Sequence, residues 1–492
     1  MRASGILLPI TSLPSPYGIG CFSKEAYTFI DFLAQSGQKY WQVLPLGPTG
    51  YGDSPYQSFS TFAGNPYFVD LEELIDKGWL SKADCQKAHY GDNLEYVDYE
   101  KIYFCRFKLL EKAYKKSGIE ANKDYKAFVR DNSFWLDDYA LYMAIKNHFK
   151  GGSYAKWPDD IRLRKVAALK QYKEDKKINA DVNLYKFIQY MFYSQWAKLK
   201  AYANEKGIEI IGDIPIYVAY DSADTWANPK LFMLDKDNTP IAVAGTPPDC
   251  FSETGQLWGN PLYNWDYHKK TNYDWWVKRI EHCFKMYDIV RIDHFRGFDE
   301  YYSIPYGDST ALNGKWMKGP GFELFDTLRK RLGKQKIIAE DLGFLTDSVI
   351  KLVKKCGYPG MKILEFAFDS DDTNAYLPHN YDKNCIVYTA THDNSTILGW
   401  YEDLPNKTKK NVRDYLGGKG TKNIVWDLIR LAHSSIADTS IIPMQDYLAL
   451  GKEATMNVPS TLGGNWTWRL EKDALTDELA KKIKAMVRLY SR

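Results

Sequence analysis

The chain has 492 residues, of which 45% are hydrophobic and 26% are charged. This balance is typical of globular proteins and excludes a disordered or fibrous chain. The 65 basic and 62 acidic side chains leave a formal charge of +3, with no long run of Lys or Arg, so nothing indicates a nucleic-acid partner. Aromatic residues make up 15% of the chain, and so many amphipathic rings favour flat ligands with polar edges, such as sugars.

The seven cysteines lie far apart and form no Cys-x-x-Cys motif, which argues against a disulfide framework and against a zinc site. A reducing cytoplasm is the simplest location that fits them. The apolar run GILLPI at residues 5–10 is too short for the core of a signal peptide. No apolar stretch approaches the roughly 18 residues of a membrane span, so we expect no segment that crosses a membrane.

Eight short apolar or β-branched segments are predicted as strands, and most of them alternate with helical patterns. The predicted strands are Gly5–Pro9, Tyr40–Leu44, Glu209–Gly212, Ile289–Ile292, Lys336–Ala339, Met361–Phe366, Cys385–Thr389 and Thr439–Pro443. The predicted helices include Lys24–Gln38, Asp274–Tyr287, Gly321–Leu332, Leu345–Lys355 and Thr476–Tyr490. Strands that alternate with helices form parallel sheets, and eight such units indicate an α/β protein with a closed (β/α)₈ barrel.

A long stretch with helical patterns separates the second predicted strand from the third. Lys101–Lys116 repeats aromatic and apolar residues at helical spacing, and the helical pattern of Leu184–Lys206 ends at Gly207, just before the third strand. We therefore predict a single barrel domain over residues 1–492 with large, mainly helical insertions in its βα loops, the largest being a subdomain at 70–205. No separate C-terminal β domain is expected.

Four acidic residues follow predicted strands directly or within a few residues, namely Asp213, Asp293, Glu340 and Asp393. The carboxyl ends of the strands in a (β/α)₈ barrel, with the loops that follow them, form the mouth of the active site. Any one such residue could instead cap a helix or sit in a turn. Four in one chain, two of them next to a histidine, favour a functional site in which the four carboxyl groups meet.

The surroundings of these acids differ. Arg291 shares one face of its strand with Asp293, so we expect its guanidinium to lower the pKa of Asp293 by about 1 to 3 units. Glu340 follows three apolar residues, 337–339, a setting that favours retention of its proton near neutral pH. Cleavage of a glycosidic bond requires one ionised and one protonated carboxyl group, which makes Asp293 the predicted nucleophile and Glu340 the predicted acid/base. Asp341 is predicted to cap a helix.

The motifs IIGDIPIY, VRIDHFRG, IIAEDLG and THDNST resemble, in this order, the four short sequence regions of the α-amylase clan. The flanking segments 44–67, 245–263 and 391–401 are similar to those of the 4-α-glucanotransferase family, the amylomaltases or disproportionating enzymes. The likeness extends from residue 8 to residue 469. It implies a (β/α)₈ enzyme that acts on α-1,4-glucans and maltooligosaccharides and needs no cofactor.

The resemblance also implies roles for individual side chains. Asp293 takes the family's nucleophile position, Glu340 the acid/base position, and Asp393 the position of a third carboxylate that grips sugar hydroxyl groups. Further residues match positions that line the innermost donor subsite: Asp213, Arg291, His294 and His392.

Two loops carry additional candidates for substrate binding. Tyr56 lies in a loop bracketed by Gly and Pro after the second predicted strand, where its ring is expected to stack on the donor sugar. Segment 245–263 is predicted as a lid or acceptor loop, because it is too polar for a core loop and too rich in Pro and Gly anchors for disorder. Its candidate residues are Asp249, Gln256 and Trp258. The competing interpretation is structural: a buried Trp258, a loop tyrosine, and His392 as a core histidine.

Patterns typical of metal or phosphate binding are missing from the sequence. The eight histidines form no His-x-His or His-x-x-x-His pair, and no Asp-rich twelve-residue calcium loop occurs. The segments GPTGYG and GGKGTK fit neither the Gly-x-Gly-x-x-Gly motif nor the P-loop. We therefore expect no metal and no cofactor.

Together these features predict a cytoplasmic 4-α-glucanotransferase that retains configuration through a covalent glucosyl-enzyme. Asp293 and Glu340 end consecutive predicted strands, and strands about 4.8 Å apart suit a retaining enzyme. The alternatives are a hydrolase of the same clan, a non-catalytic glucan-binding protein and a nucleotide-dependent glycosyltransferase, which the missing phosphate loops disfavour. The sequence leaves open the oligomeric state, the preferred chain length and the physiological pathway.

Overall fold

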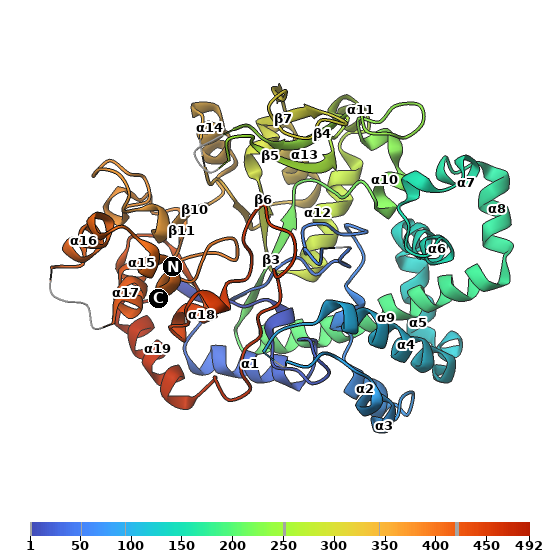
Figure 1. Cartoon of the computed structure of the whole chain (residues 1–492), viewed down its shortest axis with the longest axis horizontal. Helices are drawn as coiled ribbons and strands as arrows, with labels where there is room; N and C mark the ends of the chain where they lie inside the picture. Colours follow the sequence, from blue (N-terminus) through green and yellow to red (C-terminus); the bar gives the residue numbers. More distant parts are fainter. Residues whose placement is uncertain (1, 51, 94, 249–251, 344, 419–422) are drawn as a thin grey trace.

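The centre of the molecule is an eight-stranded parallel sheet rolled into a nearly closed barrel (Figure 1). The computed structural model describes residues 2–50, 52–93, 95–248, 252–343, 345–418 and 423–492. Around the barrel the strands follow the order β10-β11-β12-β1-β2-β3-β6-β9. Their bounds are β1 Ala3–Leu7, β2 Tyr40–Gln42, β3 Glu209–Pro215, β6 Ile289–Asp293, β9 Ile337–Ala339, β10 Gly360–Ile363, β11 Cys385–Tyr388 and β12 Thr439–Pro443. The predicted (β/α)₈ architecture is confirmed.

The barrel closes between its two edge strands, β9 and β10, through a side chain as well as the backbone. The Ala339 amide donates to the Pro359 carbonyl at 3.0 Å, and the Met361 amide donates to Asp341 Oδ1 at 2.7 Å. A Cβ atom at Gly360 would lie 2.3 Å from Asp341 Oδ2, so the glycine makes room for this carboxylate. The prediction that Asp341 caps a helix is wrong, because the next helix begins only at Asp347.

Helices pack around the outside of the sheet, and all but the one at Ile424–Ser434, which was not predicted, lie close to their predicted positions. They are α1 Lys24–Gln35, α12 Asp274–Met286, α13 Phe322–Leu332, α14 Asp347–Cys356, α17 Ile424–Ser434 and α19 Asp477–Leu489. The predicted strand Met361–Phe366 is too long, since β10 stops at Ile363 and residues 364–366 form a 3-10 helix. Within the described residues, no helix is both long and apolar enough to span a membrane.

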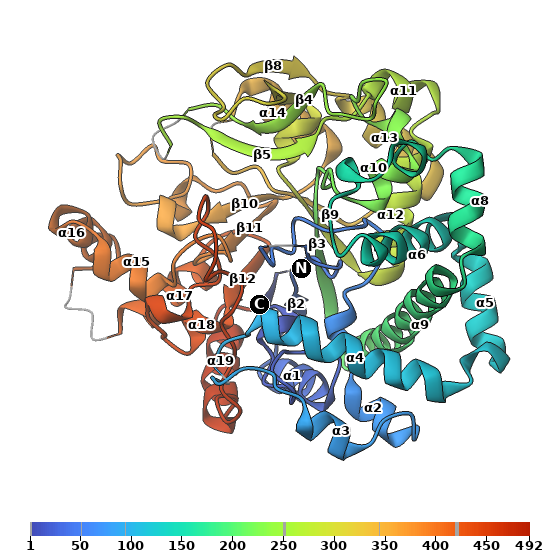
Figure 2. The same ribbon diagram turned by 45° about the vertical axis from the view of Figure 1, so that its right-hand side comes forward.

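The chain between β2 and β3 forms a group of helices on one side of the barrel (Figure 2). They are α2 Leu71–Asp76, α3 Lys82–Lys87, α4 Tyr99–Ser117, α5 Lys123–Asp131, α6 Ser133–His148, α7 Asp159–Arg162, α8 Val166–Glu174 and α9 Lys176–Glu205. Helix α9 starts eight residues before the predicted Leu184, because the Asp175 side chain caps it by accepting hydrogen bonds from two backbone amides. Its length lets it contact both the inserted helices and the barrel.

A small antiparallel sheet, in the order β5-β4-β7-β8, lies beside the barrel. Its strands are β4 Ala242–Thr246, β5 Gln256–Pro261, β7 Glu300–Pro305 and β8 Lys315–Lys318. Segment 245–263, predicted as a loop, therefore contributes strand residues at both of its ends. The pairing of β4 with β5 shifts register between Val243 and Gly245, and Gly259 within β5 has a positive φ of 76°, so glycines stand at the irregular points of this pairing.

Two glutamines of α9 hold the loop that follows β2. Gln189 accepts from the Gly64 amide at 2.7 Å and donates to the Gly64 carbonyl at 2.8 Å. Gln195 makes the same pair of contacts with the Asp70 backbone, at 2.7 and 3.3 Å. Both amide side chains are buried, so they replace the water that the loop backbone would otherwise need.

We expect Gln189→Leu to lower the free energy of unfolding by about 2–4 kcal/mol, because the buried N–H and C=O of Gly64 would lose their partners at similar side-chain volume. Urea unfolding followed by circular dichroism measures the change. Gln171→Leu on the exposed side of α8 is the matched control and should change it by less than about 0.5 kcal/mol. Equal midpoints for the two variants would contradict this explanation.

Candidate active site

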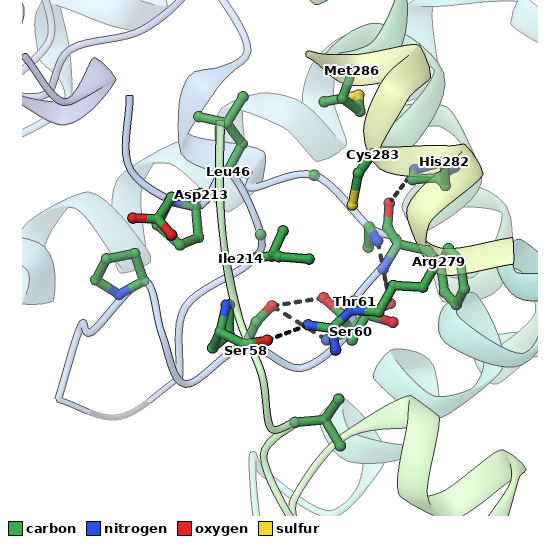
Figure 3. Close-up of a pocket in the computed structure, with 18 of the residues that line it drawn as sticks. Leu46, Ser58, Ser60, Thr61, Asp213, Ile214, Arg279, His282, Cys283 and Met286 are labelled. Atoms are coloured by element: carbon green, nitrogen blue, oxygen red, sulfur yellow. Dashed lines mark hydrogen bonds between the residues drawn. The ribbon is translucent and has the colours of Figure 1, made fainter. Parts of the chain in front are cut away.

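Asp213 is the first of the four predicted acids along the chain, and the alternation of side chains along β3 sets the direction in which it points. Asp213 and Ile214 are neighbours on β3 and point to opposite sides of the strand (Figure 3). Ile214 faces Arg279 and Cys283 of α12 across a cavity of about 60 Å³, which also borders the loop after β2. Asp213 points the other way and is fully buried.

Arg291 joins two of the predicted acids within the barrel. Its Nη1 lies 2.6 Å from Asp213 Oδ2 and its Nη2 lies 2.9 Å from Asp293 Oδ1. Its Nε donates to the Met361 sulfur at 3.4 Å. Because β3 and β6 pair with Asp213 beside Arg291, the ion pairs follow from strand register. The guanidinium fixes the direction of both carboxylates, and the Arg291 side chain is only 3% exposed.

The pKa of Asp293 departs from the prediction. Burial in the barrel raises it to about 6, and the nearby Arg291 charge offsets only part of that effect. The carboxylates of Asp213 and Asp393 raise it further. The expected lowering by Arg291 is therefore present but is outweighed by desolvation and by like charges.

Glu340 follows β9 directly, and β9 is the neighbour of β6 in the sheet. Its Oε2 accepts from the His294 amide at 2.7 Å and its Oε1 accepts from the Leu342 amide at 2.8 Å. Burial and, next, the charge of Asp293 raise the pKa of Glu340 to about 7, as the apolar setting in the sequence led us to expect. Both neighbouring carboxyl groups are therefore weaker acids than exposed carboxyl groups, and burial is the main cause in each.

A hydrogen-bonded chain links Asp213 to the fourth acid across the barrel mouth. The Tyr56 hydroxyl donates to Asp213 Oδ2 at 2.8 Å and lies 2.7 Å from His392 Nε2. His392 Nε2 is also 3.1 Å from Asp393 Oδ2. The Tyr56 and His392 rings are nearly parallel at 5.3 Å between centroids, so the ring predicted to stack on sugar already stacks on the histidine.

Asp393 is held as an anion from two sides. Although burial opposes ionisation, His392 and a hydrogen bond from Asn457 lower the pKa of Asp393 to about 2. The Asn457 amide donates to Asp393 Oδ1 at 2.7 Å. Burial tends to lower the pKa of His392, but the Asp393 carboxylate raises it above its ordinary value.

The sequence interpretation missed Asn457. It sits in an irregular segment with no motif of its own, so only the folded chain reveals that it touches Asp393. Trp466 was also missed as a site residue: its ring lies 6.0 Å from the rings of both Tyr56 and His392. The motif LGGNWTWR at residues 462–469 contains Trp466 and lies within the region of likeness to the family, so it could have identified this residue as a candidate.

The remaining candidates form a second group beside Glu340. The Trp258 and His294 rings meet edge to face at 4.8 Å, and Trp258 Nε1 donates to Gln256 Oε1 at 3.0 Å. Burial lowers the pKa of His294 to about 4, so its ring is neutral at physiological pH. Asp249 lies outside the described residues. Among the residues that are described, no group of three or more His, Cys, Asp or Glu side chains could hold a metal ion.

Comparisons with known proteins identify the family of this chain. A family model described as 4-alpha-glucanotransferase matches residues 8–476. The chain is 52% identical over 485 residues to the 4-alpha-glucanotransferase of Clostridium butyricum, covering 98% of this chain and 99% of that protein. It is 44% identical over 502 residues to that of Thermus thermophilus, covering 100% and 99%.

Among solved structures, the amylomaltase from Streptococcus agalactiae in complex with acarbose matches with a TM-score of 0.97 and 44% identity over the whole of both chains. The amylomaltase from Corynebacterium glutamicum shares 17% identity and a TM-score of 0.79, with 100% of this chain and 75% of that chain covered, and shows the common fold. The family model, the relatives and the fold lead to one conclusion: this chain belongs to the 4-alpha-glucanotransferase family.

Proposed function

We propose that this 4-alpha-glucanotransferase moves a segment of an α-1,4-glucan to the 4-hydroxyl group of an acceptor glucose or maltooligosaccharide, with retention of configuration. The observation that carries the proposal is the position of Asp293 and Glu340 at the ends of adjacent strands, where burial raises the pKa of both. Adjacent strands suit the roughly 5–5.5 Å carboxyl separation of retaining enzymes. The acarbose complex of the similar Streptococcus agalactiae amylomaltase supports the same kind of ligand.

The reaction proceeds in two displacements. An Asp293 oxygen attacks the anomeric carbon while the bond from that carbon to the departing oxygen breaks, and Glu340 gives its proton to that oxygen. In the second displacement the acceptor's 4-hydroxyl oxygen bonds to the anomeric carbon and the bond to Asp293 breaks. The hydroxyl proton passes to Glu340, which restores the starting state.

The other side chains bind and orient the sugars in this proposal. Asp393, ionised at all physiological pH values, accepts hydrogen bonds from the hydroxyl groups of the donor sugar. The linked side chains on its side of the mouth complete the innermost donor subsite: Tyr56, Asp213, Arg291 and His392. His294, the remaining residue of that subsite, lies beside Glu340, and Trp258 and Gln256 next to it form the other wall. Asp249 is proposed as an acceptor-binding residue from its place in segment 245–263 alone.

We also propose a cytoplasmic location and a distinct inserted subdomain at 70–205. Six cysteines in the described part of the chain are free thiols, which suits a reducing compartment. The subdomain proposal is supported by the uninterrupted series of helices from α2 to α9.

Maltotriose alone provides the test of the function. A transferase should give glucose together with a ladder of longer maltooligosaccharides and little gain in reducing ends, because each broken bond is replaced by a new one. Chromatography of the products and a reducing-end assay measure this, with Asp293→Asn as the inactive control. A steady rise in reducing ends without products longer than maltotriose would indicate the hydrolase instead.

The pH profile should be bell-shaped. The first displacement needs Asp293 ionised and Glu340 protonated, so kcat/KM should rise through pH about 6 and fall above pH about 7. In Glu340→Gln, transfer from maltotriose should fall by more than about 100-fold. Cleavage of a glycosyl fluoride, whose leaving group needs no proton, should be reduced far less in that variant. Equal losses for maltotriose and the fluoride would assign the proton to another group.

Arg291→Gln should move the acid limb to higher pH by about 1–3 units, because the carboxyl of Asp293 would lose its cationic partner. Arg291→Lys keeps a positive charge and should shift the limb less. Arg291→Gln also leaves the buried Asp213 carboxylate without its ion-pair partner, which destabilises the fold. Circular dichroism must therefore establish that both variants fold. An unshifted limb in folded Arg291→Gln would show that the guanidinium does not control Asp293.

A further inference from the structure

Asp393 differs from Asp293 and Glu340 in how far it lies from the end of a strand. Asp293 is the last residue of β6 and Glu340 follows β9 directly, so the sheet itself fixes their positions. Asp393, by contrast, comes five residues after the end of β11 at Tyr388. A loop residue needs other contacts to be held as accurately as a strand residue.

One buried carboxylate outside the site supplies such contacts. Asp446 lies in the short helix α18 (Met444–Tyr447), directly after β12, and is 1% exposed. Its Oδ2 accepts a short hydrogen bond from the Thr389 hydroxyl. Its Oδ1 accepts from the Ile397 amide at 2.9 Å. Since β12 is the neighbour of β11 in the sheet, Asp446 reaches across from an adjacent strand end.

The two donors stand at the two ends of the segment that carries His392 and Asp393. Thr389 follows β11, and Ile397 begins helix α15 (Ile397–Asp403). Between them the chain turns tightly, because Asn394 Oδ1 accepts from the Thr391 amide at 3.0 Å and from the Thr391 hydroxyl at 2.6 Å. A turn that is rigid within itself can still move as a unit, so its position depends on how its ends are fixed.

We propose that Asp446 is a positioning residue that fixes both ends of segment 389–397 and thereby sets Asp393 and His392 against the Arg291-bridged carboxylates. The inference rests on the proposed role of Asp393 in the transfer reaction. Asp446 does not act on the substrate itself. One carboxylate oxygen binds Thr389 at the start of the segment and the other binds Ile397 at its end, so the loss of either contact releases the corresponding end.

Asp446→Ala should lower kcat for maltotriose disproportionation by about 10- to 100-fold with little change in KM, because a misplaced catalytic group affects the transition state more than the bound substrate. In an Asp393→Asn background the same substitution should lower kcat by less than about 3-fold, since the group that it positions is already disabled. A general loss of structure would lower kcat by the same factor in both backgrounds.

Thr389 tests one end of the segment independently, which matters if Asp446→Ala does not fold. Thr389→Val, equal in shape but without the hydroxyl, should reduce kcat, whereas Thr389→Ser should restore it. Asp288→Ala is the matched control: its carboxylate accepts from the Ile210 amide at 2.8 Å and from the Asn204 side chain at 2.9 Å, before the start of β6 and away from this segment. It should lower stability without changing kcat.

The outcomes separate this inference from the proposed function. Wild-type kcat in folded Asp446→Ala or in Thr389→Val, while Asp393→Asn has a strongly reduced but measurable kcat, would overturn the positioning role alone. The same kcat loss for Asp446→Ala in both backgrounds would overturn it as well. Wild-type activity of Asp393→Asn would instead overturn the proposed role of Asp393.

Discussion

The rest of the site depends on the guanidinium of Arg291. A cation in the interior of a barrel is tolerated only when anions and hydrogen-bond acceptors surround it. Here Asp213, Asp293 and the sulfur of Met361 provide these partners. They belong to three different strands, β3, β6 and β10. Asp213 and Asp293 therefore stabilise the buried cation in addition to their proposed roles in the reaction. The same burial that makes Arg291 hold them firmly also raises the pKa of Asp293 toward neutrality.

The inserted helices reach the site through the loop after β2. Gln189 and Gln195 of α9 bind the backbone of that loop at Gly64 and Asp70, and the Tyr193 hydroxyl donates to the Phe62 carbonyl. The same loop carries Tyr56, whose hydroxyl joins Asp213 to His392. The insertion thus supports one wall of the barrel mouth, and a site built on strand ends also relies on a helix far away in the sequence.

Local patterns were sufficient to predict the eight strands and the four acids, because each signal lies within a few neighbouring residues. Properties that arise from the whole barrel could not be predicted in this way. The pKa of Asp293 depends on burial by several strands, and the strands within segment 245–263 depend on pairing with β7, about 60 residues later. Asn457 reaches Asp393 from 64 residues away without any motif.

The joint between β9 and β10 has a mechanical consequence. The other neighbouring strands of the barrel are paired by ladders of backbone hydrogen bonds. Between β9 and β10 the Asp341 carboxylate accepts a hydrogen bond from the Met361 amide in place of a backbone carbonyl. A joint with fewer cooperative bonds opens at lower energetic cost than the rest of a sheet. Glu340 immediately precedes Asp341, so we expect the most easily deformed part of the barrel to lie next to the proposed acid/base residue.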